Sequence, residues 1–544
     1  MLCLSGYSFG LTCPVAPAVA PSAAEQAYLA GDYDGAEKLY RQTLAQKPND
    51  AEMTAALVEL LLRQQRVADA SALATSAVAA NPGSVALQTA MGEVQYREGE
   101  PWLAGDSADT ALKLDSCYPR QHLLRARLYW LSYMNATAVR EIETAHALDP
   151  NDPDITDFWM GVLPLREHVA ALEQWLASPN GETGGQRQNS RGYLVRLKKT
   201  LETPPPPAPC SLTSAVSRTE LPFIEIMHNT TQIRGFGFEV KLNERRARLL
   251  FSTNQVGLLV SRSVAEKAGL KPRGDDAPSG FKGAKLFYPA FAEKIIIGGL
   301  EFHNCVVNVA DERNILDGDG LIGPSMLARF LVILDFPMRK LLLEPLPPRP
   351  GMGTEPMALA TVSSTGHEAE EKTGAESAKE TTSAPSQGRV IGPQDRYIAP
   401  EMKDWTKLYH RDWELMIPVA LNGGPKRLFT LSTGWYTTVI GLEAAKEVTK
   451  AHIDTRSHVN TVAGKVQQVF SADNVALSFA NIAQKGDDVV SFDLEPNSMR
   501  SGLEVSGYLG ITTLAQLRIQ MDYRDGLVKF DYDPHRGFAS RPLR

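Results

Sequence analysis

The chain has 544 residues, which is too many for one hydrophobic core and, at about 150 residues per domain, predicts three or four domains. Its 22% of charged and 43% of apolar residues are typical of globular proteins, and no apolar stretch reaches the ~18–20 residues that span a bilayer. The net charge of −7 provides no basic surface for phosphates, which argues against nucleic-acid binding.

Residues 1–22 contain no charged side chain and are rich in Ala, Pro and Val. The triplet Ala18-Val19-Ala20 resembles the small-residue end of a secretory signal, although no Lys or Arg precedes the apolar part and prolines interrupt it. We therefore expect a signal or disordered N-terminus on a periplasmic or secreted protein. A cytoplasmic protein, or a start codon further upstream, is the alternative.

Beyond residue 20 the chain contains three widely spaced cysteines, Cys117, Cys210 and Cys305. This number and spacing argue against a disulfide scaffold and a cysteine-based zinc site. A single Cys210–Cys305 bridge and free buried thiols are both open. The ten histidines show no metal-ligand spacing, so the sequence predicts no metal site and no cofactor.

A 34-residue period runs through residues 23–180, where Ala36, Ala70, Ala104 and Ala138 mark equivalent positions. Small residues at these positions let the two helices of a hairpin approach closely, and prolines recur where each second helix ends. This pattern is the tetratricopeptide signature, and it predicts an α-solenoid with a degenerate last unit.

The concave face of such an array binds helices or extended peptides, so we expect a protein or peptide partner. Exposed charges on repeat helices are usually only solvated. By their phase in the repeat, four charged residues are expected on the concave face as groove contacts: Glu59, Glu93, Arg97 and Arg127.

Two segments are predicted to be linkers. Residues 181–210 end in a proline run, 203–209, that should form a stiff polyproline II helix. Residues 347–390 are rich in Ser, Thr, Gly, Pro and Glu and cannot bury enough apolar surface to fold, so we expect a disordered linker over 347–395.

The blocks 211–346 and 396–544 consist of short β-branched and aliphatic runs divided by Gly, Asn and Asp, which indicates β-rich domains. They also match each other, which indicates an internal duplication. The first matching motifs are Ser252-Thr253-Asn254 and Ser432-Thr433-Gly434. The second are Gly320-Leu321-Ile322-Gly323 and Gly507-Tyr508-Leu509-Gly510.

These motifs resemble the retropepsin-like aspartic proteases, specifically bacterial ones with an N-terminal tetratricopeptide array and two tandem lobes. In that family each lobe supplies a hydrophobic-hydrophobic-Asp-Thr/Ser-Gly loop and a later hydrophobic-hydrophobic-Gly motif. The resemblance implies a multidomain α + β protein, in which an α-solenoid precedes two all-β acid-protease barrel lobes. It makes four glycines the partners of the loops: Gly320, Gly323, Gly507 and Gly510.

Ser252 and Ser432 occupy the positions of both catalytic aspartates of that family. Two carboxylates that share a proton act as acid and base, whereas a serine hydroxyl titrates far above neutral pH and is no base unaided. No intact dyad is therefore expected, and the resemblance implies a pseudoprotease that binds peptide through the repeat groove and paired lobes. The alternative is an active aspartic endopeptidase that uses displaced acids or a paired paralogue.

The loops keep other family features. Thr253 and Thr433 match threonines whose hydroxyls bond across the pseudo-twofold axis, which implies lobe pairing within one chain or in a homodimer. Gly434 keeps the residue that tolerates the tight turn, and Asn254 is the next-best residue for a positive φ. Trp435 is expected to line the cleft or to pack between the lobes.

Several other charged residues have a structural explanation. Three loop aspartates are candidates for displaced catalytic acids: Asp317, Asp319 and Asp473. Since loop aspartates are usually solvated or cap turns, a structural role is the favoured interpretation. Matched acids in the late strands are expected to form turn contacts or salt bridges, and the hairpin bases beside them to be solvated. The acids are Asp335 and Asp522, and the bases are Arg339, Lys340 and Arg524.

Overall fold

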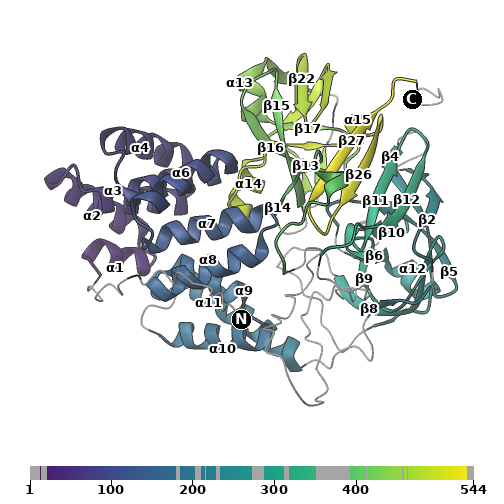
Figure 1. Ribbon diagram of the computed structural model, residues 1–544, viewed down its shortest axis with the longest axis horizontal. Coiled ribbons are helices and arrows are strands. Elements are labelled where there is room, and N and C mark those ends of the chain that lie inside the picture. The colour runs from purple at the N-terminus through teal and green to yellow at the C-terminus, as the bar shows by residue number, and fades with distance from the viewer. Residues whose placement is uncertain are drawn as a thin grey trace, which may run out of the picture. The chain divides into compact units, whose positions relative to one another are not determined.

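A computed structural model gives the structure of the chain (Figure 1). It describes residues 13, 21–178, 184–202, 210–214, 216–227, 233–255, 257–272, 287–310, 318–350, 393–411, 414–455, 457, 459–461 and 464–535. The expected polyproline segment 203–209, most of the expected linker 347–395, Asp317 and nearly all of residues 1–22 lie outside these ranges. The contacts divide the chain into a helical unit, drawn mostly from residues before 193, and a β-rich unit, drawn mostly from residues after it.

The N-terminal region forms successive helix pairs, which confirms the predicted helical repeat. The helices are α1 (Ala23–Leu29), α2 (Tyr33–Gln46), α3 (Ala51–Arg63), α4 (Val67–Ala80), α5 (Val85–Arg97), α6 (Pro101–Leu114), α7 (Pro119–Leu131), α8 (Asn135–Leu148), α9 (Pro153–Val162) and α10 (Leu165–Ala177).

The period of the sequence explains this packing. Ala36, Ala70, Ala104 and Ala138, one in each second helix, are all fully buried. A larger side chain there would force the paired helices apart. Side-chain caps fix the helix starts, as where the carboxylate of Asp50 accepts a hydrogen bond from Met53 N (3.2 Å).

The predicted linker 181–210 contains a helix. Helix α11 spans Gly184–Glu202, and the proline run begins only after it. No proline interrupts 184–202, and Leu, Lys and Arg in its second half favour a helix.

The first β-rich block forms a barrel-like sheet of order β1-β9-β6-β10-β5-β4-β8-β7, closed by β8–β9 pairing and extended by β3 on β4. Its elements are β1 (Ser211–Leu212), β3 (Ile224–Met227), β4 (Ile233–Leu242), β5 (Arg245–Phe251), β6 (Leu258–Ser261), α12 (Arg262–Lys267), β7 (Lys271–Pro272), β8 (Phe287–Ile297), β9 (Leu300–Ala310), β10 (Gly320–Ile322) and the 3₁₀ turn η1 (Pro324–Met326).

The second block repeats this plan in the order β18-β21-β24-β17-β25-β16-β15-β22-β23, with β14 on β15. Its elements are η2 (Pro400–Met402), β14 (Tyr409–Arg411), β15 (Glu414–Leu421), β16 (Lys426–Leu431), β17 (Val439–Gly441), α13 (Leu442–Val448), β18 (Ala451–Ile453), β19 (Asn460–Thr461), β20 (Gly464–Lys465), β21 (Phe470–Ala472), β22 (Val475–Phe479), β23 (Ile482–Gly486), β24 (Val489–Phe492), α14 (Glu495–Ser501), β25 (Gly507–Leu509) and α15 (Ile511–Leu514).

The last two strands of each block, β11, β12, β26 and β27, form one further sheet with the early strands β2 and β13, in the order β13-β27-β26-β11-β12-β2 (Figure 1). Strands β11 and β26 pair antiparallel at its centre, with Val332 opposite Met521. The strands are β2 (Thr219–Pro222), β11 (Phe330–Asp335), β12 (Lys340–Pro345), β13 (Thr406–Lys407), β26 (Leu517–Asp522) and β27 (Leu527–Tyr532). One hydrophobic core runs through both blocks, so the predicted α + β class with β-rich, barrel-like sheets after the repeat is confirmed.

Two disulfides are present. Cys210 and Cys305 are bonded, which decides between the two alternatives that the sequence left open. Cys13 is bonded to Cys117. This bond was not predicted, because only the cysteines beyond residue 20 were considered for pairing.

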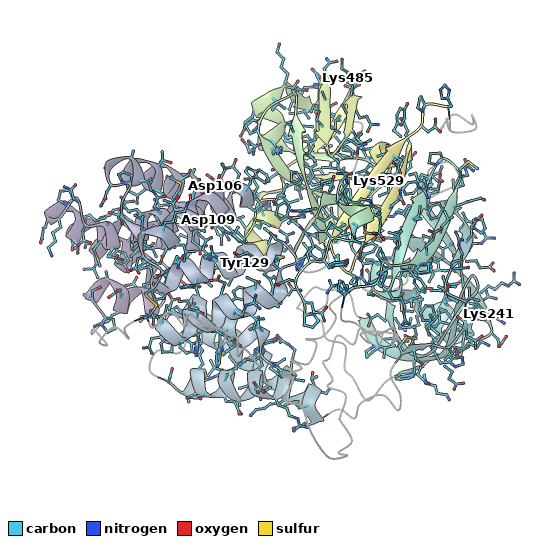
Figure 2. All side chains as sticks on the ribbon, viewed as in Figure 1. Asp106, Asp109, Tyr129, Lys241, Lys485 and Lys529 are labelled. Atoms are coloured by element: carbon cyan, nitrogen blue, oxygen red, sulfur yellow. A yellow bond between two sulfur atoms is a disulfide. The ribbon has the colours of Figure 1, made fainter. Side chains whose placement is uncertain are left out.

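Strands β4 and β27 carry partly exposed charged pairs, Lys241 with Glu244 of the following turn (2.7 Å) and Lys529 with Asp531 (3.4 Å). Figure 2 labels the two lysines. Such pairs contribute little to stability, about 0–1 kcal/mol each. None of the helices in the ranges described above is both long and apolar enough to cross a membrane.

Candidate functional site

The two Ser-Thr loops leave equivalent strands. In each block a short strand of the glycine motif runs parallel to the strand before the loop, β10 beside β5 and β25 beside β16. Ser252 N donates a hydrogen bond to Ile322 O, and Ser432 N donates one to Leu509 O, both at 3.0 Å. The duplication seen in the sequence therefore places the two serines at matching points of matching strands.

The two threonines exchange hydrogen bonds across a local two-fold axis. The Thr253 hydroxyl donates to Leu431 O (2.6 Å), and the Thr433 hydroxyl donates to Phe251 O (2.9 Å). Each hydroxyl also accepts from the other threonine's backbone N at 3.1 Å. All four bonds are buried, where an unpaired backbone group would be costly, so this exchange fixes how the two loops meet.

The two serines differ in their surroundings. Ser432 is fully buried, and its hydroxyl oxygen has no hydrogen-bond partner among the described residues. Ser252 is 7% exposed and lies against the opposite loop, where a Cβ added to Gly434 would be 2.5 Å from Ser252 Oγ. Both positions are thus neutral and buried, and Ser252 is slightly more exposed than Ser432.

Position 434 requires a glycine for a different physical reason from the one expected. Neither Gly434 nor Asn254 has a positive φ, so the prediction based on left-handed backbone was wrong. Gly434 instead leaves room for the Ser252 side chain. Asn254 Oδ1 lies 3.0 Å from the Thr253 hydroxyl oxygen, whose proton is donated to the closer Leu431 O.

The partner glycines are positions of close backbone approach. A Cβ at Gly320, Gly507 or Gly510 would lie 2.2–2.5 Å from a backbone oxygen of a neighbouring segment. Gly323 N donates to Gly257 O at 2.8 Å. A side chain at Gly320, Gly507 or Gly510 would push the glycine-motif strands away from β6 in the first lobe and from residues 437–439 in the second.

The aromatic residue beside the second loop packs within its own lobe. The Trp435 ring stacks on Tyr508 (centroids 5.5 Å apart) and on Phe492 (6.2 Å). Trp435 is only partly buried, so part of its side chain stays accessible beside the loop. This stacking anchors the start of the loop after Ser432.

The described candidates for a displaced acid have other partners. Asp319 accepts a hydrogen bond from Arg248 N (2.8 Å). Asp319 precedes the first residue of β10, whereas Ser252 contacts the last residue of that strand, Ile322. Asp473 pairs with His452 (3.3 Å).

The matched acids of the late strands hold turns, as predicted. Asp335 accepts from Met338 N (3.1 Å), and Asp522 accepts from Arg524 N (2.9 Å). The expectation that Arg524 is a solvated charge was wrong: its Nε donates to buried Asp525 (2.8 Å) and its Nη2 to Pro347 O (2.9 Å). Arg339 and Lys340 are half-exposed and pair with Glu225 and Glu220.

Three of the four charged residues predicted for the repeat groove form ion pairs inside the helical unit, and the fourth, Arg97, donates a hydrogen bond there. Glu93, 3% exposed, pairs with Arg127 at 2.7 Å. Glu59 pairs with Arg120 at 2.5 Å, and Arg97 Nη2 donates to Gln65 Oε1. The four residues are thus engaged with this chain itself rather than free for a partner.

These pairs belong to a larger set that we call the inner ion-pair cluster: Glu59, Arg63, Glu93, Arg120, Arg127, Asp152 and Asp154. Burial raises the pKa of Glu59 to about 8, against the opposing effect of Arg120. The nearby arginines Arg63 and Arg120 lower the pKa of Asp154 to about 2, although its burial acts in the opposite direction. Four members of the cluster were not predicted from the sequence, since their partners lie about 30–90 residues away along the chain: Arg63, Arg120, Asp152 and Asp154.

Comparisons with known proteins support the helical repeat. Residues 27–94 match the family described as "Tetratricopeptide repeat". No curated protein matches the sequence. Among solved structures, a thermophilic tetratricopeptide protein of Thermus thermophilus is 20% identical, with 32% of this chain and 95% of that chain covered and a TM-score of 0.27.

Two other solved structures are similar in part. A MamA protein is 18% identical, with 32% of this chain and 84% of that chain covered and a TM-score of 0.20. A retropepsin-like aspartic protease from Rickettsia conorii is 21% identical, with 24% of this chain and 94% of that chain covered and a TM-score of 0.19. With TM-scores this low, these similarities carry no argument about function. What the family match and the helices show is that the N-terminal region contains tetratricopeptide repeats.

Proposed function

We propose that this chain is a non-catalytic protein with two retropepsin-like lobes, which holds an extended segment of a protein partner. The observation that carries the proposal is that neutral hydroxyls, those of Ser252 and Ser432, stand at the two equivalent strand ends beside the threonine exchange. Peptide hydrolysis on such a scaffold needs a pair of carboxylates that share one proton. Two alcohols supply neither a base nor an acid near neutral pH.

The surroundings of the serines also argue against a serine nucleophile. Such a nucleophile needs a base in hydrogen-bond reach and a third group that orients the base. Ser432 Oγ has no hydrogen-bond partner among the described residues, and Ser252 Oγ abuts Gly434. Neither serine therefore has the geometry of an activated hydroxyl.

The two lobes are proposed to act as one body within a single chain. The β11–β26 ladder and the four threonine hydrogen bonds support pairing within the chain over pairing in a homodimer. The tetratricopeptide region is proposed as a second protein-binding element, since such arrays bind helices or extended peptides. Because the inner ion-pair cluster occupies its charged residues, the partner would meet other side chains of the repeat.

Activity assays separate this proposal from an active peptidase. The purified chain is incubated with unfolded casein from about pH 3 to about pH 8, with and without pepstatin. We expect no cleavage at any pH. Pepstatin-sensitive cleavage that disappears when one aspartate is replaced, for example in Asp319→Asn, would overturn the proposal in favour of displaced acids.

Binding is tested separately, by crosslinking unfolded casein to the chain with a photoreactive amino acid at position 435 and, as a control, at position 241. Position 435 follows the second loop, and Lys241 faces solvent on β4 (Figure 2). Crosslinks at 435 and not at 241 support a peptide held at the loops. Equal crosslinking at both positions would contradict it.

An oxidising compartment is proposed from the disulfides. Bridges such as Cys13–Cys117 and Cys210–Cys305 persist in the periplasm or outside cells and are rare in the cytosol. Alkylation of the chain in freshly lysed cells, followed by mass spectrometry, should find all four cysteines oxidised. Alkylated Cys210 and Cys305 would favour the cytoplasmic alternative.

A further inference from the structure

Three potential metal ligands converge on one face of the second lobe, each from the end of a different strand. His452 lies on β18 opposite Ser471 of β21, and Ser471 also lies opposite Val490 of β24. Asp473 comes two residues after Ser471, and Asp488 comes two residues before Val490. The strand pairing thus brings the three residues to one edge of the sheet, where Asp473 directly follows β21 and Asp488, with a φ of 54°, directly precedes β24.

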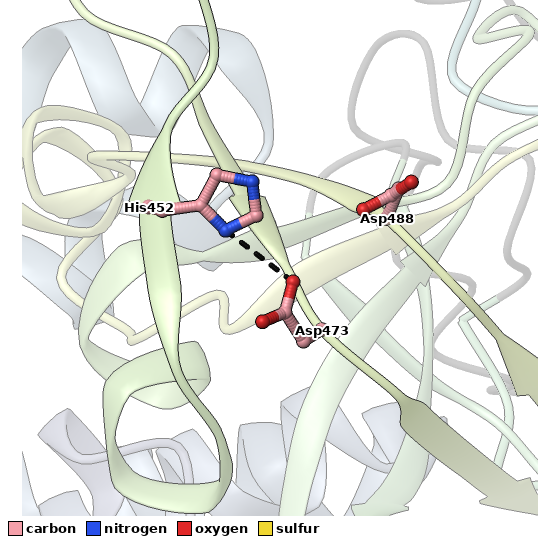
Figure 3. A group of neighbouring side chains, drawn as sticks. All are labelled: His452, Asp473 and Asp488. Carbon is pink, nitrogen blue, oxygen red and sulfur yellow. Dashed lines mark ion pairs between the residues drawn. The ribbon is translucent and has the colours of Figure 1, made fainter.

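The distances suit a single small cation. One ligand atom from each of His452, Asp473 and Asp488 lies within 4.8 Å of the others (Figure 3). His452 Nδ1 and Asp473 Oδ1 are 3.3 Å apart. Two ligands of a tetrahedral zinc ion, each about 2.0–2.1 Å from the metal, are themselves about 3.3–3.4 Å apart.

Other hydrogen bonds hold the ligands in place. Ser471 Oγ donates to Asp488 Oδ1 (3.2 Å). The backbone of Asp473 is fixed on both sides, because its N donates to Lys450 O (3.1 Å) and its O accepts from the Thr449 hydroxyl (2.5 Å). Such supporting bonds orient metal ligands in proteins. His452 and Asp488 are exposed, so a cation can enter from solvent and keep water ligands.

The charge of the group also favours a cation. Two carboxylates face one imidazole, which leaves excess negative charge at the end of β18. In the first lobe the strand after the short helix is β7, and there Lys271 pairs with Glu293 at 3.2 Å. A lysine neutralises the carboxylate at that place, whereas the second lobe has a histidine and an additional acid.

We propose that His452, Asp473 and Asp488 bind one divalent transition-metal cation of the zinc type. The imidazole selects zinc-like ions over magnesium and calcium, which prefer oxygen ligands alone. Bound there, the ion joins the ends of β18, β21 and β24 and stabilises that edge of the lobe. The proposal is independent of any peptide binding at the serine loops.

Calorimetric titration of the full chain with zinc chloride tests the site. We expect saturable one-to-one binding that weakens at least about tenfold in His452→Gln and in Asp488→Asn. Two controls should bind zinc as the unaltered chain does. Asp487→Asn removes the adjacent exposed acid, and His303→Gln removes an imidazole that has one carboxylate partner, Glu301, at 2.7 Å.

Other results would overturn the proposal. One is that His452→Gln and Asp488→Asn leave zinc binding unchanged. Another is that the His303→Gln control weakens zinc binding as much as they do. The third is that magnesium or calcium binds as tightly as zinc. X-ray absorption of the zinc-loaded chain gives a direct readout. One imidazole nitrogen with oxygen ligands is expected, and a sulfur or a second imidazole in the shell would place the ion elsewhere.

Discussion

Arg349 and Asp525 form a buried ion pair that joins the two sides of the segment 351–392. Asp525, fully buried, receives Arg349 Nη2 from before that segment and Tyr397 N (2.7 Å) from after it, both on its Oδ1. Arg524 Nε donates to its other oxygen at 2.8 Å. One carboxylate in the β26–β27 turn thus holds the chain where it leaves the first lobe and where it enters the second.

Asp525→Asn should therefore destabilise the β-rich unit strongly. Removing one member of a buried pair leaves the others uncompensated, at a cost of about 3–5 kcal/mol. Hydrogen exchange of β26 amides during urea unfolding measures the loss in this unit alone. The matched control is Asp531→Asn, a half-exposed acid on β27 whose loss should cost no more than about 1 kcal/mol. Equal effects of the two changes would show that the Asp525 contacts contribute little.

Gly434→Ala should destabilise the β-rich unit by about 1–3 kcal/mol, because the new methyl would lie 2.5 Å from Ser252 Oγ. Adding Ser252→Ala removes that oxygen and leaves the nearest contact, to the Cβ of residue 252, at 3.1 Å. The double variant should thus be more stable than Gly434→Ala alone, as measured by urea unfolding. Additive losses would mean that the two loops do not meet as described.

Thr433→Val and Thr253→Val should cause similar losses of about 2–4 kcal/mol each. Each change leaves one buried backbone N–H and one buried C=O without the hydroxyl that serves them. Thr144→Val is a suitable control, since that exposed hydroxyl bonds to Arg140 O in its own helix (2.9 Å). Urea unfolding followed by hydrogen exchange compares the three variants, and a loss from only one of the loop threonines would contradict the two-fold arrangement.

Stability of the β-rich unit should decrease between about pH 4 and about pH 6 because of Asp522. Burial, with the nearby charge of Asp525, raises the pKa of this carboxyl to about 6 from the usual 3.8. The folded state then holds the proton more tightly than the unfolded state, so stability is highest below the unfolded pKa and declines through the folded one. The total is on the order of 2–3 kcal/mol.

Asp522→Asn should flatten this decline, because its amide oxygen still accepts from Arg524 N and Asp525 N without taking a charge. Thermal unfolding at several pH values is the measurement. A decline that persists unchanged in the variant would assign the pH dependence to another group.

Arg127→Ala should destabilise the helical unit by about 3 kcal/mol, since it leaves the buried carboxylate of Glu93 without its partner. Arg41→Ala is the control: Arg41 is half-exposed, and its pair with Glu37 within one helix contributes about 0.3–0.5 kcal/mol. Chemical unfolding followed by circular dichroism at 222 nm reports mainly on helices, at about 1 kcal/mol precision. If Arg127→Ala left the stability of the helical unit unchanged, Arg127 would again be a candidate for contact with a partner in the groove.

Much of the fold could be predicted from local patterns. The buried alanines 34 residues apart give the helix pairs, and the duplicated Ser-Thr and glycine motifs give two matching strand arrangements. The prediction for Asn254 and Gly434 failed, because the requirement for a small residue comes from Ser252 on the other loop and not from the local backbone.

Ion pairs were predicted least well. The sequence places Glu93 and Arg127 on helix faces, yet only packing shows that they face each other and not solvent. The same holds for Arg524, whose buried partner is the next residue, Asp525. His452 and the two acids beside it stay largely exposed, and only the strand pairing shows that they lie together. A charge is solvated or paired according to which side chains the fold brings near it.

By itself the sequence determined the repeat, the duplication and the absence of acids at positions 252 and 432, since periodicity and residue identity are local properties. Only the tertiary structure decided how buried the two serines are, which charges are paired and which cysteines are bonded. Those properties depend on contacts between residues far apart in the chain, and long-range contacts exist only after the helices and strands have packed.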